Sequence, residues 1–150
     1  MTTTLAPVSP TLTITEEILV RATLEKTFAS LLEQIGPLND NGDGKPMPMV
    51  IEAKPGGRWY RDLGGDNGHL WGFVQSIKRP TLLEIYGPLF LSTGATSNLM
   101  YRLKEIDGGS LITFTHTLVG PVPDDMRPQM AEGWASMHAR VKQAAEGRSR

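Results

Sequence analysis

The stretch PGGRWYRDLGGDNGHLWGFV, residues 55–74, places two tryptophans, a histidine and two arginines among six glycines. This mixture fits either a catalytic cluster or two strands folded back on each other with one side facing a cavity. The Gly-Gly pairs permit tight reversals of the chain, which favours the hairpin. The side chains expected to turn inward are Trp59, Trp71 and Phe73. The stretch therefore predicts paired strands rather than a catalytic triad.

Short apolar segments alternate with turn residues from Met49 to Val119, and this pattern is typical of an antiparallel sheet. Strands are expected at 49–54, 58–63, 69–78, 82–87, 96–106 and 110–119. In the last of these, Phe114 and His116 share one face, and threonines occupy the other. The alternation predicts a sheet with one apolar side and one solvated side.

Two helical patterns accompany these strands. A β-branched strand is expected at 11–22; after it, the apolar residues of segment 24–35 recur on one helical face, and Gly36–Pro37 ends the pattern. A second helix is expected at about 124–146. One arc of that helix, roughly 100° wide, contains Met126, Met130, Gly133, Trp134, Met137, Val141, Ala144 and Ala145. A sheet with one apolar face needs a cover, and only this helix is long enough to provide it.

Composition narrows the classes of function. The chain has 150 residues and a net charge of −1; this predicts one globular domain at 11–146 and gives no basic surface for nucleic acid. Residues 1–10 are expected to form a flexible arm, and 147–150 a short tail. The absence of cysteine excludes disulfides and thiolate metal sites. With no signal-peptide pattern and no apolar run of about 18 residues, we expect a cytoplasmic protein without a membrane span.

Four motifs in this order carry a family resemblance: PGGRWY, GHLWGFVQSIKRPTLLEI, GGSLITFTH, and the pair Gly133–Trp134 in the last helix. Over residues 11–146 the chain resembles the START-like or SRPBCC superfamily, specifically the branch named after activators of the heat-shock-protein-90 ATPase. The resemblance implies an α+β helix-grip fold, with a curved antiparallel sheet of about seven strands wrapped around the long C-terminal helix. It also implies a cavity for apolar or amphipathic small molecules and supplies no shared catalytic motif.

One segment departs from the superfamily pattern. A short second helix commonly follows the first in this superfamily, whereas here the segment reads PLNDNGDGKPMP. The sequence therefore does not determine the shape of the entrance to the cavity.

The predicted cavity lies between the sheet and the second helix. Its expected lining is Trp59, Arg61, Trp71, Phe73, Leu99, Tyr101, Phe114, His116, Met130, Trp134 and Met137. Two of these have alternative interpretations. His116 is either a core residue with satisfied hydrogen bonds or a polar contact for a ligand, and Arg61 is either an exposed strand charge or an anchor for a carboxylate or phosphate.

Metal binding has little support in the sequence. Asn39, Asn41 and Asp43 match the first ligand positions of a calcium loop, but the position that requires a bidentate glutamate is Val50. The histidines His69, His116 and His138 do not show zinc-ligand spacing, and His69 and His138 are expected near the surface. We therefore expect a solvated turn at 37–48, with no metal and no cofactor.

Three functions are compatible with these patterns. The first is a non-catalytic module that encloses a small hydrophobic or amphipathic ligand. The second is a protein-interaction domain that stimulates a chaperone ATPase, as the family name suggests. The third is a small enzyme, such as a cyclase or hydrolase, with His116 as the proton-transfer group and Tyr101 assisting it. The ligand and the choice between monomer and homodimer are not determined by the sequence.

Overall fold

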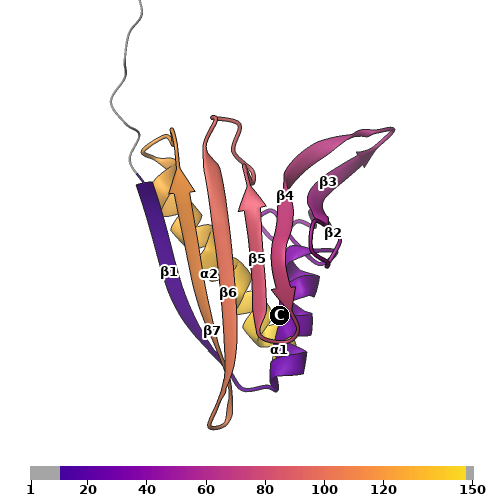
Figure 1. Ribbon diagram of the computed structural model, residues 1–150, viewed down its shortest axis with the longest axis vertical. Helices are drawn as coiled ribbons and strands as arrows, with labels where there is room; N and C mark the ends of the chain where they lie inside the picture. Colours follow the sequence, from indigo (N-terminus) through magenta and orange to yellow (C-terminus); the bar gives the residue numbers. More distant parts are fainter. Residues whose placement is uncertain (1–10, 148–150) are drawn as a thin grey trace, which may run out of the picture.

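The computed structural model describes residues 11–147; the predicted arm and residues 148–150 of the predicted tail lie outside this range. Seven antiparallel strands form one curved sheet in the order β1-β7-β6-β5-β4-β3-β2 (Figure 1). The strands are β1 (Thr11–Val20), β2 (Val50–Ile51), β3 (Arg58–Gly64), β4 (Asn67–Lys78), β5 (Leu82–Gly87), β6 (Thr96–Ile106) and β7 (Gly109–Val119). The predicted α+β fold is confirmed.

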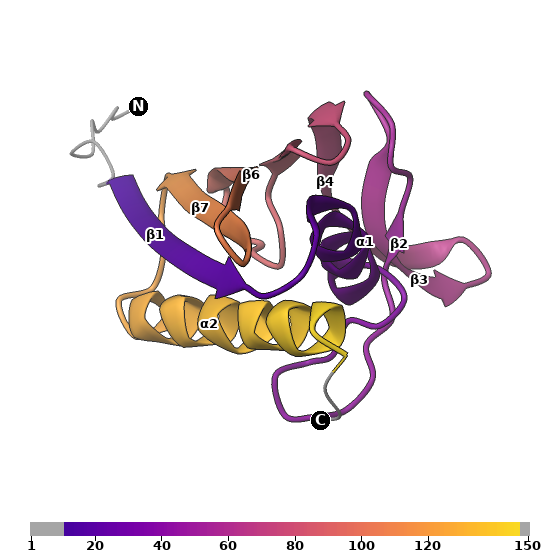
Figure 2. The ribbon, with the colours of Figure 1, turned by 90° about the horizontal axis from the view of Figure 1, so that it is seen from below.

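Helix α1 (Leu24–Ile35) and helix α2 (Met126–Ala145) lie on the concave side of this sheet (Figure 2). Thr23 begins α1, because its side-chain oxygen accepts a hydrogen bond from the Lys26 amide at 3.2 Å and satisfies one of the unpaired N–H groups of the first turn. The helices are joined where Ser30 Oγ donates to the Val141 carbonyl oxygen at 2.8 Å. Neither helix of the described chain is long and apolar enough to cross a membrane.

Strand β7 shows the alternation expected from the sequence. Phe114, His116 and Leu118 are fully buried, whereas the intervening threonines reach the other face of the sheet. The buried side faces the two helices, so the core lies between them and the sheet. This half of the sheet has continuous pairing, since β7 is flanked along its length by β1 and β6.

The hairpin of β3 and β4 turns at Gly65 and Asp66, which both have positive φ; this conformation suits a two-residue hairpin loop. Trp59 pairs with Gly72, but Tyr60 pairs with Leu70. Trp71 therefore lies opposite no single residue of β3, which is the arrangement of a β-bulge.

The bulge decides which side chains of β4 face inward. It lets Trp71 lie on the same side as Trp59, with ring centroids 5.1 Å apart. Phe73 falls on the opposite, convex face, where its ring lies 5.7 Å from that of Tyr86. Our expectation that Phe73 turns toward the helix was wrong, because strict alternation does not continue through a bulge.

The segment between α1 and β3 is mostly irregular. Strand β2 covers only Val50–Ile51 rather than the predicted 49–54, and no helix lies between α1 and β2 in this described part of the chain. The segment forms a loop closed by a bridge between Asp40 and Pro46. This loop passes close to the C-terminal half of α2 (Figure 2), where it borders the candidate site.

Candidate functional site

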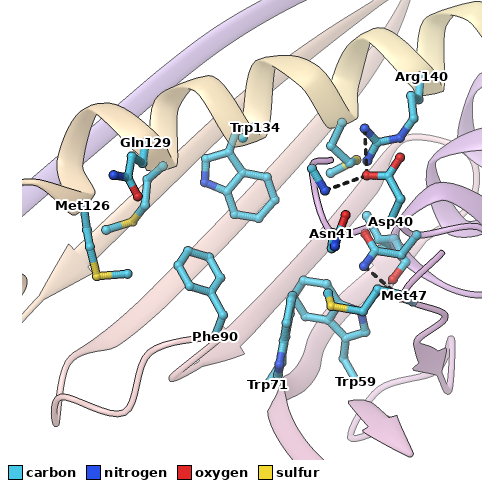
Figure 3. Close-up of a pocket in the computed structure, with 16 residues that line it drawn as sticks. Asp40, Asn41, Met47, Trp59, Trp71, Phe90, Met126, Gln129, Trp134 and Arg140 are labelled. Carbon is cyan, nitrogen blue, oxygen red and sulfur yellow. Dashed lines mark hydrogen bonds and ion pairs between the residues drawn. The ribbon is translucent and has the colours of Figure 1, made fainter. Parts of the chain in front are cut away.

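A pocket of about 390 Å³ lies between α2, the loop that follows α1, and the inner ends of β3 and β4 (Figure 3). It is lined by Ile35, Asn39, Asp40, Asn41, Gly42, Met47, Trp59, Trp71, Phe90, Met126, Gln129, Met130, Gly133, Trp134, Met137 and Arg140. Aromatic rings and thioethers form most of its wall, and amide and charged groups gather at the end nearest the loop. The pocket is partly open to solvent, since the lining residues Asn41, Gly42 and Gly133 are exposed.

All three tryptophans of the sequence line this pocket. Trp59 is nearly fully buried, and its indole nitrogen donates to the Ile35 carbonyl oxygen at 2.8 Å. This bond satisfies a carbonyl at the C-terminal end of α1, where helical partners are missing. Trp71 packs edge-on against Trp59 and donates to His69 Nδ1 at 3.1 Å. These two rings therefore form a fixed wall.

Phe90 extends this wall from the loop between β5 and β6. Its ring lies 5.8 Å from that of Trp71. The preceding residue, Leu89, has a φ of 56° and donates its amide to the Trp71 carbonyl oxygen at 2.8 Å. A positive φ at leucine is uncommon and persists only where its surroundings hold it. Phe90 is thus held beside the pocket by the bulge, although no periodic sequence pattern identifies it.

Helix α2 contributes the opposite wall. Met126, Met130 and Met137 line the pocket together with Trp134, and thioethers are flexible and polarisable enough to adapt to different ligands. The Trp134 indole nitrogen donates to His116 Nδ1 at 3.0 Å. That hydrogen bond fixes the orientation of the ring at the boundary between pocket and core.

An ion pair closes the polar end of the pocket. The Arg140 guanidinium lies 3.2 Å from Asp40 Oδ1, and both side chains are largely buried. Asp40 Oδ1 also accepts from the Gly42 amide at 2.9 Å, so the same carboxylate shapes the loop. Among the residues that line the pocket, Asp40 and Arg140 are the only ionisable ones, and they neutralise each other.

The predicted solvated turn at 37–48 is correct for most of its length, since residues 37–38, 41–46 and 48 are exposed. Asn39 is the exception: it is buried and donates to the Met47 carbonyl oxygen at 3.1 Å. Asn41 Oδ1 accepts from the amides of Asp43 and Lys45 and so stabilises the turn. Within residues 11–147, no three histidine or acidic side chains gather in a way that could hold a metal.

His116 lies in the core beside the pocket rather than in its wall. Because Nδ1 accepts from Trp134, the ring proton resides on Nε2, which lies 2.9 Å from Ser97 Oγ. Burial lowers the pKa of His116 to about 4. Protonation of Nδ1 would place two donors against each other, which agrees with this direction. The ring therefore acts as a neutral link between α2, β7 and β6.

A second buried network differs from our expectation. His138, expected near the surface, is 1% exposed, because it lies on the side of α2 that faces the sheet. Its Nδ1 lies 2.5 Å from Glu16 Oε1, and its Nε2 lies 2.9 Å from the Tyr101 hydroxyl. Burial lowers the pKa of His138, and the hydrogen bond to Glu16 opposes this effect. Burial raises the pKa of Tyr101.

Five residues of the predicted lining meet at the pocket: Trp59, Trp71, Met130, Trp134 and Met137. The structure places six others away from it: Arg61, Phe73, Leu99, Tyr101, Phe114 and His116. Arg61 lies opposite His69 on the projecting hairpin. Four of the remaining residues are fully packed core side chains: Leu99, Tyr101, Phe114 and His116. Alternation assigned them correctly to the inner face, but the helices cover that part of the face directly.

The curved sheet, the terminal helix along its concave side and the pocket between them define a protein of the START-like, SRPBCC class. The family model described as "Activator of Hsp90 ATPase homolog 1-like protein" matches residues 44–146. The chain belongs to this family.

Solved structures show the same fold at low sequence identity. Ara h 8.0201 is similar with a TM-score of 0.69 and 15% identity, covering 92% of this chain and 99% of the other. A protein from Rhizobium leguminosarum gives a TM-score of 0.70 and 14% identity, with coverage of 93% and 97%. The Aha1 dimer from Colwellia psychrerythraea gives a TM-score of 0.67 and 16% identity, covering 90% of this chain and 96% of the other. Comparison with curated proteins by sequence gives no match.

Proposed function

We propose that this protein binds an uncharged small molecule with a mainly apolar body, without transforming it chemically. The observation that carries this proposal is the aromatic and thioether wall around a pocket of about 390 Å³. Small-molecule sites are concave, mostly apolar and roughly 300–1,000 Å³ in volume, with a few polar groups that fix orientation. Ligand binding of this kind agrees with the function that the sequence favours.

The two charged groups of the pocket lining are paired with each other, and this supports an uncharged ligand. Asp40 and Arg140 are its only ionisable groups, and they lie 3.2 Å apart with both side chains largely buried. A ligand carrying a charge would have to compete with one member of this pair, and separating a buried pair is costly. Amides such as Asn41 and Gln129 instead suit a neutral hydroxyl or carbonyl group.

The buried histidines support binding without catalysis. Each ring nitrogen of His116 and His138 has a partner in the protein, and neither residue lines the pocket. A general acid or base must reach the proton that it transfers. The proposed enzymatic roles of His116 and Tyr101 therefore have no support in this geometry.

Intrinsic fluorescence can test this proposal, because every tryptophan of the chain lines the pocket. We expect the neutral dye N-phenyl-1-naphthylamine to quench this emission saturably, with one dye bound per chain. Phe90→Ala should weaken dye binding about tenfold, since it removes one aromatic wall. The matched control is Tyr86→Ala, which removes an exposed ring from the convex face and should leave affinity unchanged. Equal loss in both variants, or no saturable quenching, would contradict the proposal.

Contact with a chaperone ATPase is a second candidate, favoured by the description of the family to which the chain belongs. It requires only a protein surface and is compatible with an occupied pocket. A pull-down with an Hsp90-type chaperone and an ATPase assay would test it. No capture and no stimulation of hydrolysis would remove this candidate without affecting the first.

A further inference from the structure

The glycines of this chain fall into groups according to their backbone conformation and the space around them. All sixteen lie among the described residues. Eleven have a positive φ, which side chains rarely adopt. Four others, Gly36, Gly57, Gly68 and Gly72, would bring an added Cβ to within 2.7 Å of a backbone oxygen or closer. Fifteen of the sixteen are therefore explained by conformation or by close packing.

Gly133 is the exception. It lies inside the 20-residue helix α2, its φ is not positive, and an added Cβ would meet no atom within 4 Å. Only proline is less favourable than glycine inside a helix. Neither the backbone nor a neighbouring group therefore accounts for this glycine, and what the missing side chain leaves is empty space.

Gly133 is exposed and lines the pocket, so this space lies on the solvent-facing side of the pocket. With 100° between successive residues of a helix, Gly133 falls near the centre of the arc of α2 that lines the pocket. One turn earlier this arc contains Gln129 and Met130, and one turn later it contains Met137. Trp71 and Phe90 line the same pocket from the side opposite the helix (Figure 3), so a side chain at 133 would reduce the space between α2 and this wall.

We propose that Gly133 is a specificity-determining residue that keeps the pocket open, so that the apolar body of the ligand lies across the backbone of α2 at this position. This inference rests on the proposed ligand binding and adds the place where the ligand crosses the helix. A larger residue here would exclude ligands by size while leaving the fold intact, because no protein atom occupies the space that it would fill.

Three variants test this inference, with binding of N-phenyl-1-naphthylamine and thermal unfolding measured for each. Gly133→Phe should weaken binding about tenfold or more without lowering the midpoint of unfolding. Gly133→Ala should raise that midpoint by roughly 2–4 °C and change affinity by no more than about threefold. The matched control is Ala135→Phe, which adds the same ring to an exposed position about 200° around the helix from residue 133 and should bind as the wild type does.

The outcomes separate this inference from the function on which it rests. Wild-type protein that fails to bind the dye would overturn both. Binding by wild type with equal binding by Gly133→Phe would overturn the role of Gly133 alone, as would equal losses in Gly133→Phe and Ala135→Phe. If Gly133→Phe does not fold, Gly133→Leu takes its place with the same expected loss of binding.

Discussion

The two sides of helix α2 meet very different surroundings. Toward β1, β6 and β7 the helix is fastened by His138 to Glu16 and Tyr101, and by Trp134 to His116. Toward β3 and β4 the helix faces a pocket instead, and Figure 1 shows the β3–β4 hairpin bending away from β5. Helix α2 thus packs directly against one half of the sheet and borders a pocket at the other half. We call the half formed by β1, β6 and β7 the sealed half, and the half formed by β3 and β4 the hollow half.

This difference assigns stability and binding to separate regions. In the sealed half, every ring nitrogen of His116 and His138 has a partner at the distances given above, as burial requires. In the hollow half, a bulge, a strained leucine and an isolated glycine each leave or shape open space. Mutations on the two sides of α2 should therefore separate unfolding free energy from ligand affinity.

Phe114→Ala should give the largest effect. The ring is fully buried, and its centroid lies 4.7 Å from the ring centroid of Tyr101 and 5.0 Å from that of Trp134. We expect a loss of about 3–5 kcal/mol in the free energy of unfolding, measured by urea denaturation. Protein that remains folded should still bind the neutral dye, because Phe114 does not line the pocket.

The pocket-wall counterpart to this variant is Phe90→Ala, which should weaken dye binding. It should lower the free energy of unfolding by about 1 kcal/mol or less, since Phe90 is 37% exposed. A loss of stability comparable to that of Phe114→Ala would contradict the proposed separation of roles.

Acid should give the next largest effect, because it lowers the free energy of unfolding through His116 in the sealed half. The pKa of His116 is about 4 in the folded protein, against 6.5 for the unperturbed side chain. As the pH falls, the unfolded chain therefore takes up this proton before the folded protein does. The free energy of unfolding is unaffected by this group above about pH 6.5 and decreases as the pH falls from 6.5 to 4. Below pH 4 this group causes no further decrease. The loss is at most about 3 kcal/mol.

Urea denaturation at pH 7 and pH 4.5 measures this loss. In His116→Gln the difference between the two pH values should shrink, because the titrating ring is gone, even if the variant is less stable at both. An unchanged difference would show that His116 does not carry this pH dependence.

Asp40→Asn should have the smallest effect and acts on the hollow half. It removes the negative member of the pair at the polar end of the pocket, so the potential near Arg140 becomes more positive. We expect the affinity for the anionic dye 8-anilino-1-naphthalenesulfonate to rise about threefold relative to the neutral dye. Fluorescence titration with both dyes measures this ratio. A ratio unchanged from wild type would contradict the position assigned to the ion pair.

The sequence predicted elements whose hydrophobic period is regular. The alternation around Phe114 and the helical arc through Trp134 identified the inner face of the sheet and of α2, because burial follows side-chain direction in regular structure. The same reasoning placed Phe73 and His138 on the wrong side. Phe73 follows a bulge, and His138 lies at the edge of the helical arc, where contact with Tyr101 and Glu16 decides burial.

Sequence alone thus determined the α+β order of the elements, the antiparallel sheet and the apolar face of the terminal helix. Only the tertiary structure decided which part of that face is filled and which is open. The reason is that a pocket depends on how distant segments approach each other: Phe90, Trp71 and Asp40 come from three separate regions and are brought together by a bulge, a positive φ and an ion pair. Local periodicity does not report such long-range contacts.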